Sequence, residues 1–203
     1  MTWKELIEKL KRLMEKPNTH TEKPTPQPQA QEPQQPTIDP NRKTNIGLVK
    51  YAEAQLGRPY WYGCFGQKAS EALYDNKRRQ YPRYYTATDF PKQYGQKVHD
   101  CIGLIKGYMW TDNADSTHYE YQANGFKDMS ADMYYNHCTR KGDSINTMPE
   151  VPGILVFMKG HVGIYVGDGW VIEARGHSYG VVKTYLKSRP WKKWAYIEEI
   201  QYL

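Results

Sequence analysis

Apolar residues follow a helical spacing in the first sixteen positions of the chain, with Lys and Glu between them. They are Leu6, Ile7, Leu10, Leu13 and Met14. This pattern predicts a short amphipathic helix over residues 2–16. Because an isolated helix of this length is marginal in water, we expect it to bind a partner. Docking to another protein or self-association is favoured over binding to a membrane surface and over a frayed tail without a partner.

The helical pattern stops over residues 17–43, which repeat Pro and Gln and contain no aromatic residue and a single isoleucine. Such a segment cannot bury enough apolar surface to offset the entropy lost when it becomes ordered. We therefore predict an extended linker with polyproline character. Residues 44–203 remain, and they have the size of one catalytic domain.

Helical spacing returns in the first half of this domain. Thr44 is a typical cap for a helix that runs to about Gln55, with Gly57 just beyond its end. Asp100 is placed to cap a second helix, over about residues 101–110. The other expected segments are helices over about 67–77 and 128–140 and a mostly irregular stretch over 78–99.

After Pro149 the pattern changes to short runs of β-branched and aromatic residues, separated by Gly, Asp, Ser and Pro. The expected strands are 154–158, 161–167, 170–175, 181–186 and 194–200. Helices followed by an antiparallel meander predict an α+β domain, in which N-terminal helices pack on a C-terminal antiparallel sheet.

The predicted hairpin GHVGIYVGDGWVIEARG has two plausible registers. A two-residue turn at Asp168-Gly169 pairs Ile164 with Glu173 and mixes charge into an apolar face. A three-residue loop over 167–169 shifts the pairing by one residue and separates apolar from polar positions. It gathers on one face Val162, Ile164, Val166, Trp170, Ile172 and Ala174. We prefer this second register because its faces are cleanly partitioned.

In the preferred register Glu173 lies opposite Gly163 and diagonal to His161. Diagonal neighbours are about 7–8 Å apart, within reach of two long side chains. A carboxylate in this position holds the imidazole in one tautomer and stabilises its protonated form. An ordinary surface His–Glu pair is the alternative interpretation.

Cys101 is the candidate nucleophile, in the sequence His99-Asp100-Cys101-Ile102-Gly103. At a helix start, the helix dipole and a neighbouring imidazolium are expected to lower the pKa of the thiol, and backbone N–H groups can donate to an oxyanion. A buried, inert cysteine is the alternative, and it is the role we expect for Cys64 and Cys138. The cysteine spacing predicts neither a disulfide framework nor a zinc site, and no metal or cofactor is expected.

A Cys at a helix start, a His that opens a strand and an acid one strand later is the order of papain-type peptidases. The chain resembles the NlpC-type family of cell-wall cysteine peptidases over about residues 46–200. The segments that carry the resemblance are Gly57–Tyr60, Asp100–Leu104, Gly160–Gly167 and Val171–Ala174. The resemblance implies a papain-like NlpC-type fold.

The resemblance also implies roles for individual residues. Cys101 matches the nucleophile and His161 the general base, and Glu173 stands where most members have a second His or another polar orienting residue. Substrate-binding positions are also implied: Tyr60 matches a tyrosine that lines the site, with Tyr62 beside it, and Asp100 resembles a residue that holds the free amine of a stem peptide.

The implied activity is hydrolysis of a stem-peptide bond in peptidoglycan, usually the bond between γ-D-glutamate and the diamino acid. The Cys–His–Glu set is also similar to CHAP-type amidases, which cut other wall bonds. The chain departs from the family pattern at two motifs. It has Asp-Cys-Ile at 100–102, where Asp-Cys-Ser is usual, and Gly63-Cys64, where Gly-Gly is usual. It also has some 36 residues between Cys64 and Cys101, where shorter members have about a dozen. This insertion is expected to rim the cleft.

The remaining features concern delivery and partners. The net charge of +6 favours acidic partners such as wall polymers, and we expect no nucleic-acid ligand. No apolar run reaches the about 20 residues of a membrane span. The first residues lack a secretory signal pattern, so we expect synthesis in the cytoplasm and release onto the wall by a phage or a virion-associated machine. The Glu-Ala-Arg-Gly stretch at 173–176 resembles members carried by phages and mobile elements.

Two other functions compete with wall hydrolysis. One is a structural component of a phage tail or secretion device that binds the wall without cutting it, which the N-terminal helix and linker would suit. The other is a related acyltransferase that acts on lipids. The low overall hydrophobicity of the chain argues mildly against the second.

Overall fold

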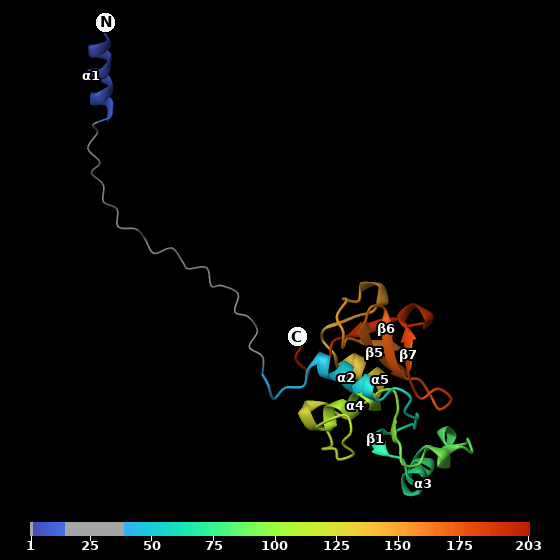
Figure 1. Cartoon of the computed structure of the whole chain (residues 1–203). Helices are drawn as coiled ribbons and strands as arrows, with labels where there is room; N and C mark the ends of the chain where they lie inside the picture. Colours follow the sequence, from blue (N-terminus) through green and yellow to red (C-terminus); the bar gives the residue numbers. More distant parts are fainter. Residues whose placement is uncertain (1, 15–38) are drawn as a thin grey trace. The chain divides into compact units, whose positions relative to one another are not determined.

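The computed structural model describes residues 2–14 and 39–203 (Figure 1). The N-terminal part contains helix α1 (Trp3–Met14), which falls within the predicted range of 2–16. Trp3, Ile7 and Leu10 are exposed, and they form an apolar set on a helix with charged residues between. Residues 15–16 of the predicted helix and most of the predicted linker lie outside the described residues.

Residues 39–203 form a separate unit with four further α-helices, five 3₁₀ turns and eight strands among the described residues. The helices are α2 (Asn45–Ala54), α3 (Glu71–Gln80), α4 (Gly103–Trp110) and α5 (Ala131–His137). The 3₁₀ turns are η1 (Pro82–Tyr84), η2 (Phe90–Gln93), η3 (Ala123–Gly125), η4 (Ile145–Thr147) and η5 (Leu186–Ser188). None of the described helices in either unit is long and apolar enough to cross a membrane.

The strands form two antiparallel sheets. A small sheet joins β1 (Phe65–Lys68) to β2 (Lys97–His99). The main sheet has the order β3-β8-β4-β5-β6-β7. Its strands are β3 (Lys141–Gly142), β4 (Leu155–Met158), β5 (His161–Gly167), β6 (Trp170–Ala174), β7 (Val181–Tyr185) and β8 (Lys193–Ala195). The predicted α+β class, with a sheet in the C-terminal half, is confirmed.

Local signals in the sequence explain where most helices begin. The Thr44 hydroxyl accepts a hydrogen bond from the amide of Gly47 at 3.0 Å, which confirms the predicted cap of α2. Helix α3 begins at Glu71, four residues later than predicted, and Ser70 caps it. The delay arises because residues 67 and 68, expected at the helix start, belong to strand β1 and pair with residues 98 and 97.

The main sheet departs from the predicted meander in two strands, of which β3 was not expected and pairs with β8. Strands β4 to β7 follow one another as neighbours, but β8 crosses to the far side of β4, where Ala195 pairs with Leu155. The last strand is also shorter than predicted, because Ile197 and Ile200 leave the sheet and pack in the helix-side core. In Figure 1, β5–β7 lie in the orange part of the domain, with α2, α4 and α5 beside them.

Helices and sheet enclose the largest hydrophobic cluster. It includes the sheet residues Leu155, Phe157, Val162, Ile164, Ile172 and Ala174, packed with side chains of α2, α4 and α5. The opposite face of the sheet is buried at its centre as well, by Val156, Tyr165, Val171 and Trp191. Because both faces are covered, a charged side chain in the middle of a strand needs a partner inside the protein.

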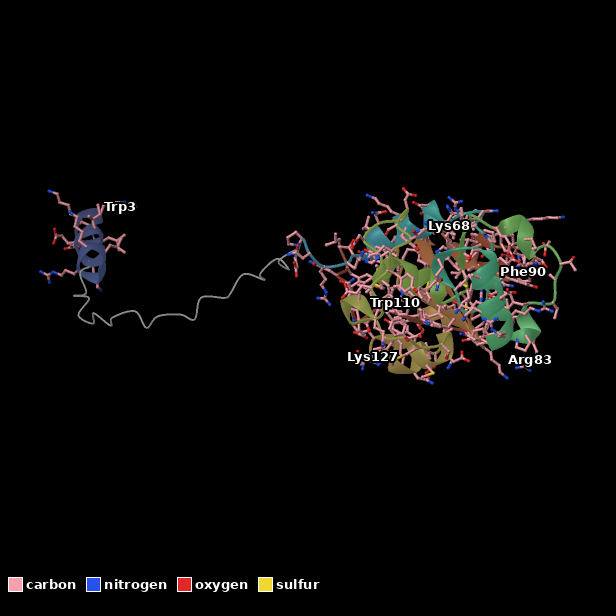
Figure 2. All side chains as sticks on the ribbon, turned by 90° about the horizontal axis from the view of Figure 1, so that it is seen from below. Trp3, Lys68, Arg83, Phe90, Trp110 and Lys127 are labelled. Carbon is pink, nitrogen blue, oxygen red and sulfur yellow. The ribbon has the colours of Figure 1, made fainter. Side chains whose placement is uncertain are left out.

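The segment between Cys64 and Cys101 has its own small core. Trp61 packs edge-on against Tyr85 and Phe90, with ring centroids 5.9 and 5.3 Å apart, and Cys64 is buried in the same cluster. Figure 2 labels Arg83 and Phe90 of this segment. The expected irregular stretch at 78–99 therefore contains the end of α3, two 3₁₀ turns and strand β2.

Candidate active site

The β5–β6 hairpin has the register that we preferred, but its tip is built differently. Ile164 pairs with Ile172 and Tyr165 with Val171, which places Glu173 opposite Gly163. At the tip, however, Gly167 pairs with Trp170 across the two-residue turn Asp168-Gly169. Both turn residues have positive φ, 52° and 76°, as a type I′ turn requires.

A bulge at Val166 reconciles the two features. The extra residue shifts the pairing by one position between the tip and the body of the hairpin. The two-residue turn and the clean apolar partition had been treated as alternatives, and the structure contains both. Glu173 consequently shares a face with His161.

His161 and Glu173 form a hydrogen-bonded pair, with Nε2 of His161 2.7 Å from Oε2 of Glu173. The Glu173 side chain is fully buried, and the His161 side chain is 15% exposed. The His161 ring also stacks on Trp191, with centroids 5.6 Å apart and 13° between the planes. Because Nε2 faces Glu173, Nδ1 is the nitrogen left to exchange a proton with a nucleophile.

Three further hydrogen bonds hold Glu173. Arg189 donates from Nε and Nη2, each at 3.0 Å, and the Thr184 hydroxyl donates at 2.7 Å. Burial by itself raises the pKa of Glu173, but hydrogen bonds from His161, Arg189 and Thr184 outweigh it and leave the pKa below its ordinary value. Glu173 is therefore an ionised, orienting carboxylate.

Arg189, Thr184 and Trp191 were not found from the sequence. Thr184 reaches Glu173 because Glu173 pairs with Val182, which makes Thr184 its diagonal neighbour. That pairing depends on the register between β6 and β7. Arg189 lies in an irregular turn after β7. The one usable signal was that a carboxylate buried in a sheet requires a cation nearby.

The cysteine side of the site is built at the start of α4. Asp100 Oδ1 accepts a hydrogen bond from the amide of Gly103 at 2.6 Å, which confirms its capping role. Regular helix begins at Gly103, so Cys101 lies in the turn just before it. A Cβ on Gly103 would lie 1.9 Å from the carbonyl oxygen of Cys64, so only glycine permits this approach.

The Cys101 sulfur lies against strand β5, where the backbone amide of Val162 is close enough to favour the ionised form of the thiol. This amide belongs to the peptide bond that follows His161. Across residues 39–203, no hydrogen bond joins the sulfur to the His161 ring. The structure thus brings Cys101 to the backbone beside His161, whereas it joins His161 and Glu173 through their side chains.

The pKa of Cys101 differs from the expectation. Burial, with a further contribution from the Asp100 carboxylate, raises the pKa of the thiol to about 12. The amides of Val162 and Ile102 act in the opposite direction but do not offset burial. The predicted lowering by the helix start is therefore wrong for this state, in which the thiol is protonated at neutral pH.

A cavity of about 460 Å³ opens beside Cys101, and Asp100 and Tyr62 line it. Both Asp100 oxygens bind backbone amides, since Oδ2 accepts from Gly63 at 2.8 Å. Tyr62 stacks face to face on Tyr84, with centroids 3.7 Å apart. Burial, followed by the charges of the neighbouring Asp100 and Cys101, raises the pKa of Tyr60. The substrate-binding roles of these residues stay predictions.

The other two cysteines are buried within hydrophobic clusters, as expected. Burial raises the pKa of Cys64 and of Cys138 to about 12. In the part of the chain that the structure describes, no group of three or more His, Cys, Asp or Glu side chains is arranged to hold a metal ion.

The chain is similar to one known protein family and to several solved structures. The sequence model of the NlpC/P60 family matches residues 57–199. A search of curated proteins finds no match. Among solved structures, the chain is similar to NlpC2 from Trichomonas vaginalis, with 18% identity and a TM-score of 0.46 over 78% of this chain and 48% of that one. The chain thus spans about half the length of that protein.

Two mycobacterial structures are similar to the same extent. One is the peptidoglycan hydrolase RipB from Mycobacterium tuberculosis, with 18% identity and a TM-score of 0.47 over 78% of this chain and 65% of that one. The other is the P60 domain of an antigen from M. avium subspecies paratuberculosis, with 19% identity and a TM-score of 0.47 over 78% and 96%. The family match carries more weight than these distant structural likenesses.

Proposed function

Because this chain belongs to the NlpC/P60 family, we propose that it is a cysteine peptidase that hydrolyses a stem-peptide bond of peptidoglycan. Cys101 is the nucleophile, His161 the general base and Glu173 the residue that orients His161. One observation carries the proposal: a fixed His161–Glu173 pair opens a strand whose next amide contacts the Cys101 sulfur.

The proposed reaction is acyl transfer in two steps. The Cys101 proton moves to Nδ1 of His161 as the sulfur attacks the substrate carbonyl, and the C–N bond then breaks as His161 returns that proton to the leaving amine. Water next attacks the thioester, with His161 as base, and releases the acid and the thiol. Because burial keeps the free thiol neutral, its ionisation belongs to the attack step.

The resemblance to the family favours the bond between γ-D-glutamate and the diamino acid, with a CHAP-like amidase cut as the other outcome. The Glu-Ala-Arg-Gly stretch supports an association with a phage or mobile element, either as an endolysin or as part of a virion. The exposed Trp3, Ile7 and Leu10 of α1 support docking of that helix to a protein partner or to a second copy.

Digestion of purified peptidoglycan tests the proposed function. The full chain is incubated with the polymer, and mass spectrometry identifies the released fragments. We expect fragments that end at one stem-peptide bond. Fragments from another bond would correct the substrate, and release of no fragment would exclude hydrolysis.

A non-catalytic, wall-binding component is the second candidate. The observation in its favour is the neutral Cys101 thiol, which contacts the Val162 amide instead of the imidazole. Co-sedimentation of the chain with peptidoglycan, without release of fragments, would support this candidate.

A further inference from the structure

Four side chains with a formal charge line the cavity beside Cys101. They are Asp100, Asp128, Lys77 and Lys106. Two acids and two bases make it formally neutral. Its chemistry therefore depends on which of the charges already have partners within the protein.

Three of the four are engaged. Asp100 binds the amides of Gly63 and Gly103 through its two oxygens. Lys106 lies 2.5 Å from Asp128, and the Lys106 side chain is only 10% exposed. The second oxygen of Asp128 accepts a hydrogen bond from the Tyr121 hydroxyl at 2.7 Å. These groups are satisfied before any ligand arrives.

Lys77 is the exception. Its ammonium makes no hydrogen bond or ion pair with any residue in the two described ranges. It lies 5.8 Å from the centre of the Tyr81 ring, and it attracts the Asp100 and Asp128 carboxylates only at longer range. Lys77 is half-buried, and its Nζ would lie 3.5 Å from a Cβ placed on Gly63. The cation is thus held over the segment whose amide binds Asp100.

A half-desolvated ammonium in a cleft favours an anionic ligand, because charge-assisted hydrogen bonds strengthen where water is partly excluded. The acids that line the cavity attract Lys77 at longer range but make no ion pair with it, because their oxygens bind the groups named above. Lys77 belongs to α3, in the segment between Cys64 and Cys101 that is longer than in short members of the family. The insertion therefore supplies a cation to the wall of the cavity.

We propose that Lys77 binds a carboxylate of the substrate, so that the enzyme prefers peptides with a free carboxylate next to the scissile bond over the matching carboxamides. This inference rests on the proposed peptidase function and adds a specificity-determining residue to it. The group recognised is a carboxylate on a residue that flanks the cut.

Two synthetic stem peptides that differ only in carboxylate or carboxamide at that residue test the proposal. Values of kcat and KM are measured for the wild-type chain, for Lys77→Gln and for Arg79→Gln. Arg79 is the matched control because it is an exposed cation in the same turn of α3 and lies outside the cavity. Circular dichroism shows that each variant is folded.

We expect the wild-type chain to favour the carboxylate peptide about tenfold or more in kcat/KM, the size of one charge-assisted hydrogen bond. Lys77→Gln should remove the preference by raising KM for the carboxylate peptide alone. Arg79→Gln should keep the preference, and added salt should weaken it in the wild-type chain.

The failures of the two proposals are distinguishable. If the wild-type chain cleaves both peptides equally, or if Lys77→Gln slows both to the same extent, the peptidase function stands and the role of Lys77 is wrong. If the wild-type chain cleaves neither peptide and releases nothing from peptidoglycan, the proposed function fails, and this inference fails with it.

Discussion

The two sides of the proposed catalytic site differ in how far they are assembled in the free protein. On the sheet side, Glu173 has hydrogen bonds from three side chains, and the His161 ring lies between Glu173 and Trp191. On the helix side, Cys101 is protonated and contacts a backbone amide. The proposed general base is therefore oriented in advance, whereas the proposed nucleophile still has to be activated.

The difference follows from the charges that each side buries. The sheet side buries an anion together with a cation, Arg189, so that the carboxylate stays ionised. The helix side buries a thiol next to the Asp100 carboxylate, which opposes the formation of a second negative charge. The predictions below test this contrast, from the largest expected effect to the smallest.

Cys101→Ala should give the largest effect, a loss of about 10⁴-fold or more in the release of wall fragments, because it removes the nucleophile. The melting temperature should change little. Cys138→Ala is the control, since this cysteine is buried in the core away from the cavity. That variant should be less stable but active, and wall lysis by Cys101→Ala at the wild-type rate would contradict the mechanism.

Glu173→Gln should lower kcat by about 10²-fold, because His161 loses its orienting charge. It should also destabilise the fold by about 3–5 kcal/mol, because Arg189 is left without its anion. Kinetics and denaturant unfolding measure the two effects.

The double variant Glu173→Gln, Arg189→Gln should recover part of the lost stability but not the activity. Equal destabilisation by the single and double variants would show that the ion pair is not what holds this side together.

The contribution of Glu173 to stability depends on pH with a definite sign. Since the pKa of Glu173 is lowered by folding, its contribution to stability is present above its unfolded pKa and is lost as pH falls through the folded value.

His99, which directly precedes Asp100, should weaken the helix side in acid. It is fully buried, and burial, followed by the charges of Lys97 and Arg58, lowers its pKa from 6.5 to about 3. The unfolded chain therefore gains a proton below pH 6.5 that the folded chain does not, which costs about 2 kcal/mol at pH 5.

Urea unfolding of the wild type and of His99→Gln between pH 7 and 4 measures this effect. The glutamine variant should lose less stability in acid, because its side chain does not titrate. Identical pH slopes for the two proteins would show that His99 is not the cause.

Alkylation of Cys101 should give the smallest effect. With a thiol pKa of about 12, the thiolate fraction, and hence the rate of reaction with iodoacetamide, should rise about tenfold per pH unit from pH 7 to 9. A rate independent of pH over this range would indicate a preformed thiolate–imidazolium pair and would remove the contrast between the two sides. Mass spectrometry of the labelled peptide assigns the reaction to Cys101.

Sequence reasoning succeeded where one short segment contains all the information. The Thr44 and Asp100 caps and the alternation along β5 and β6 are local, and the structure contains each of them. It failed where distant segments meet. Strand β1 was missed because its partner, residues 97–99, lies about thirty positions away, and β8 was misplaced because its crossover has no local signal.

The same limit applies to the proposed site. Cys101, His161 and Glu173 were chosen from sequence motifs and from the alternation of side chains between the two faces of the β5–β6 hairpin. Arg189 reaches Glu173 from a turn outside the hairpin, and its contact depends on the folded position of β7. The direction of the Cys101 pKa also depends on burial, which residue order does not reveal. Local pattern thus suggested the proposed reacting groups, whereas the packed interior determines their protonation.

The bulge at Val166 has a consequence for changes in chain length. Hairpin tips usually accept extra or missing residues, and they are common places for epitope tags or evolutionary insertions. In this hairpin the pairs Ile164–Ile172 and Tyr165–Val171 would survive the loss of Val166, because Gly167 would then follow Tyr165 directly and still pair with Trp170. A relative that lacks this one residue is therefore expected to keep the acid on the same face as the imidazole, with a regular two-residue hairpin in place of the bulged one.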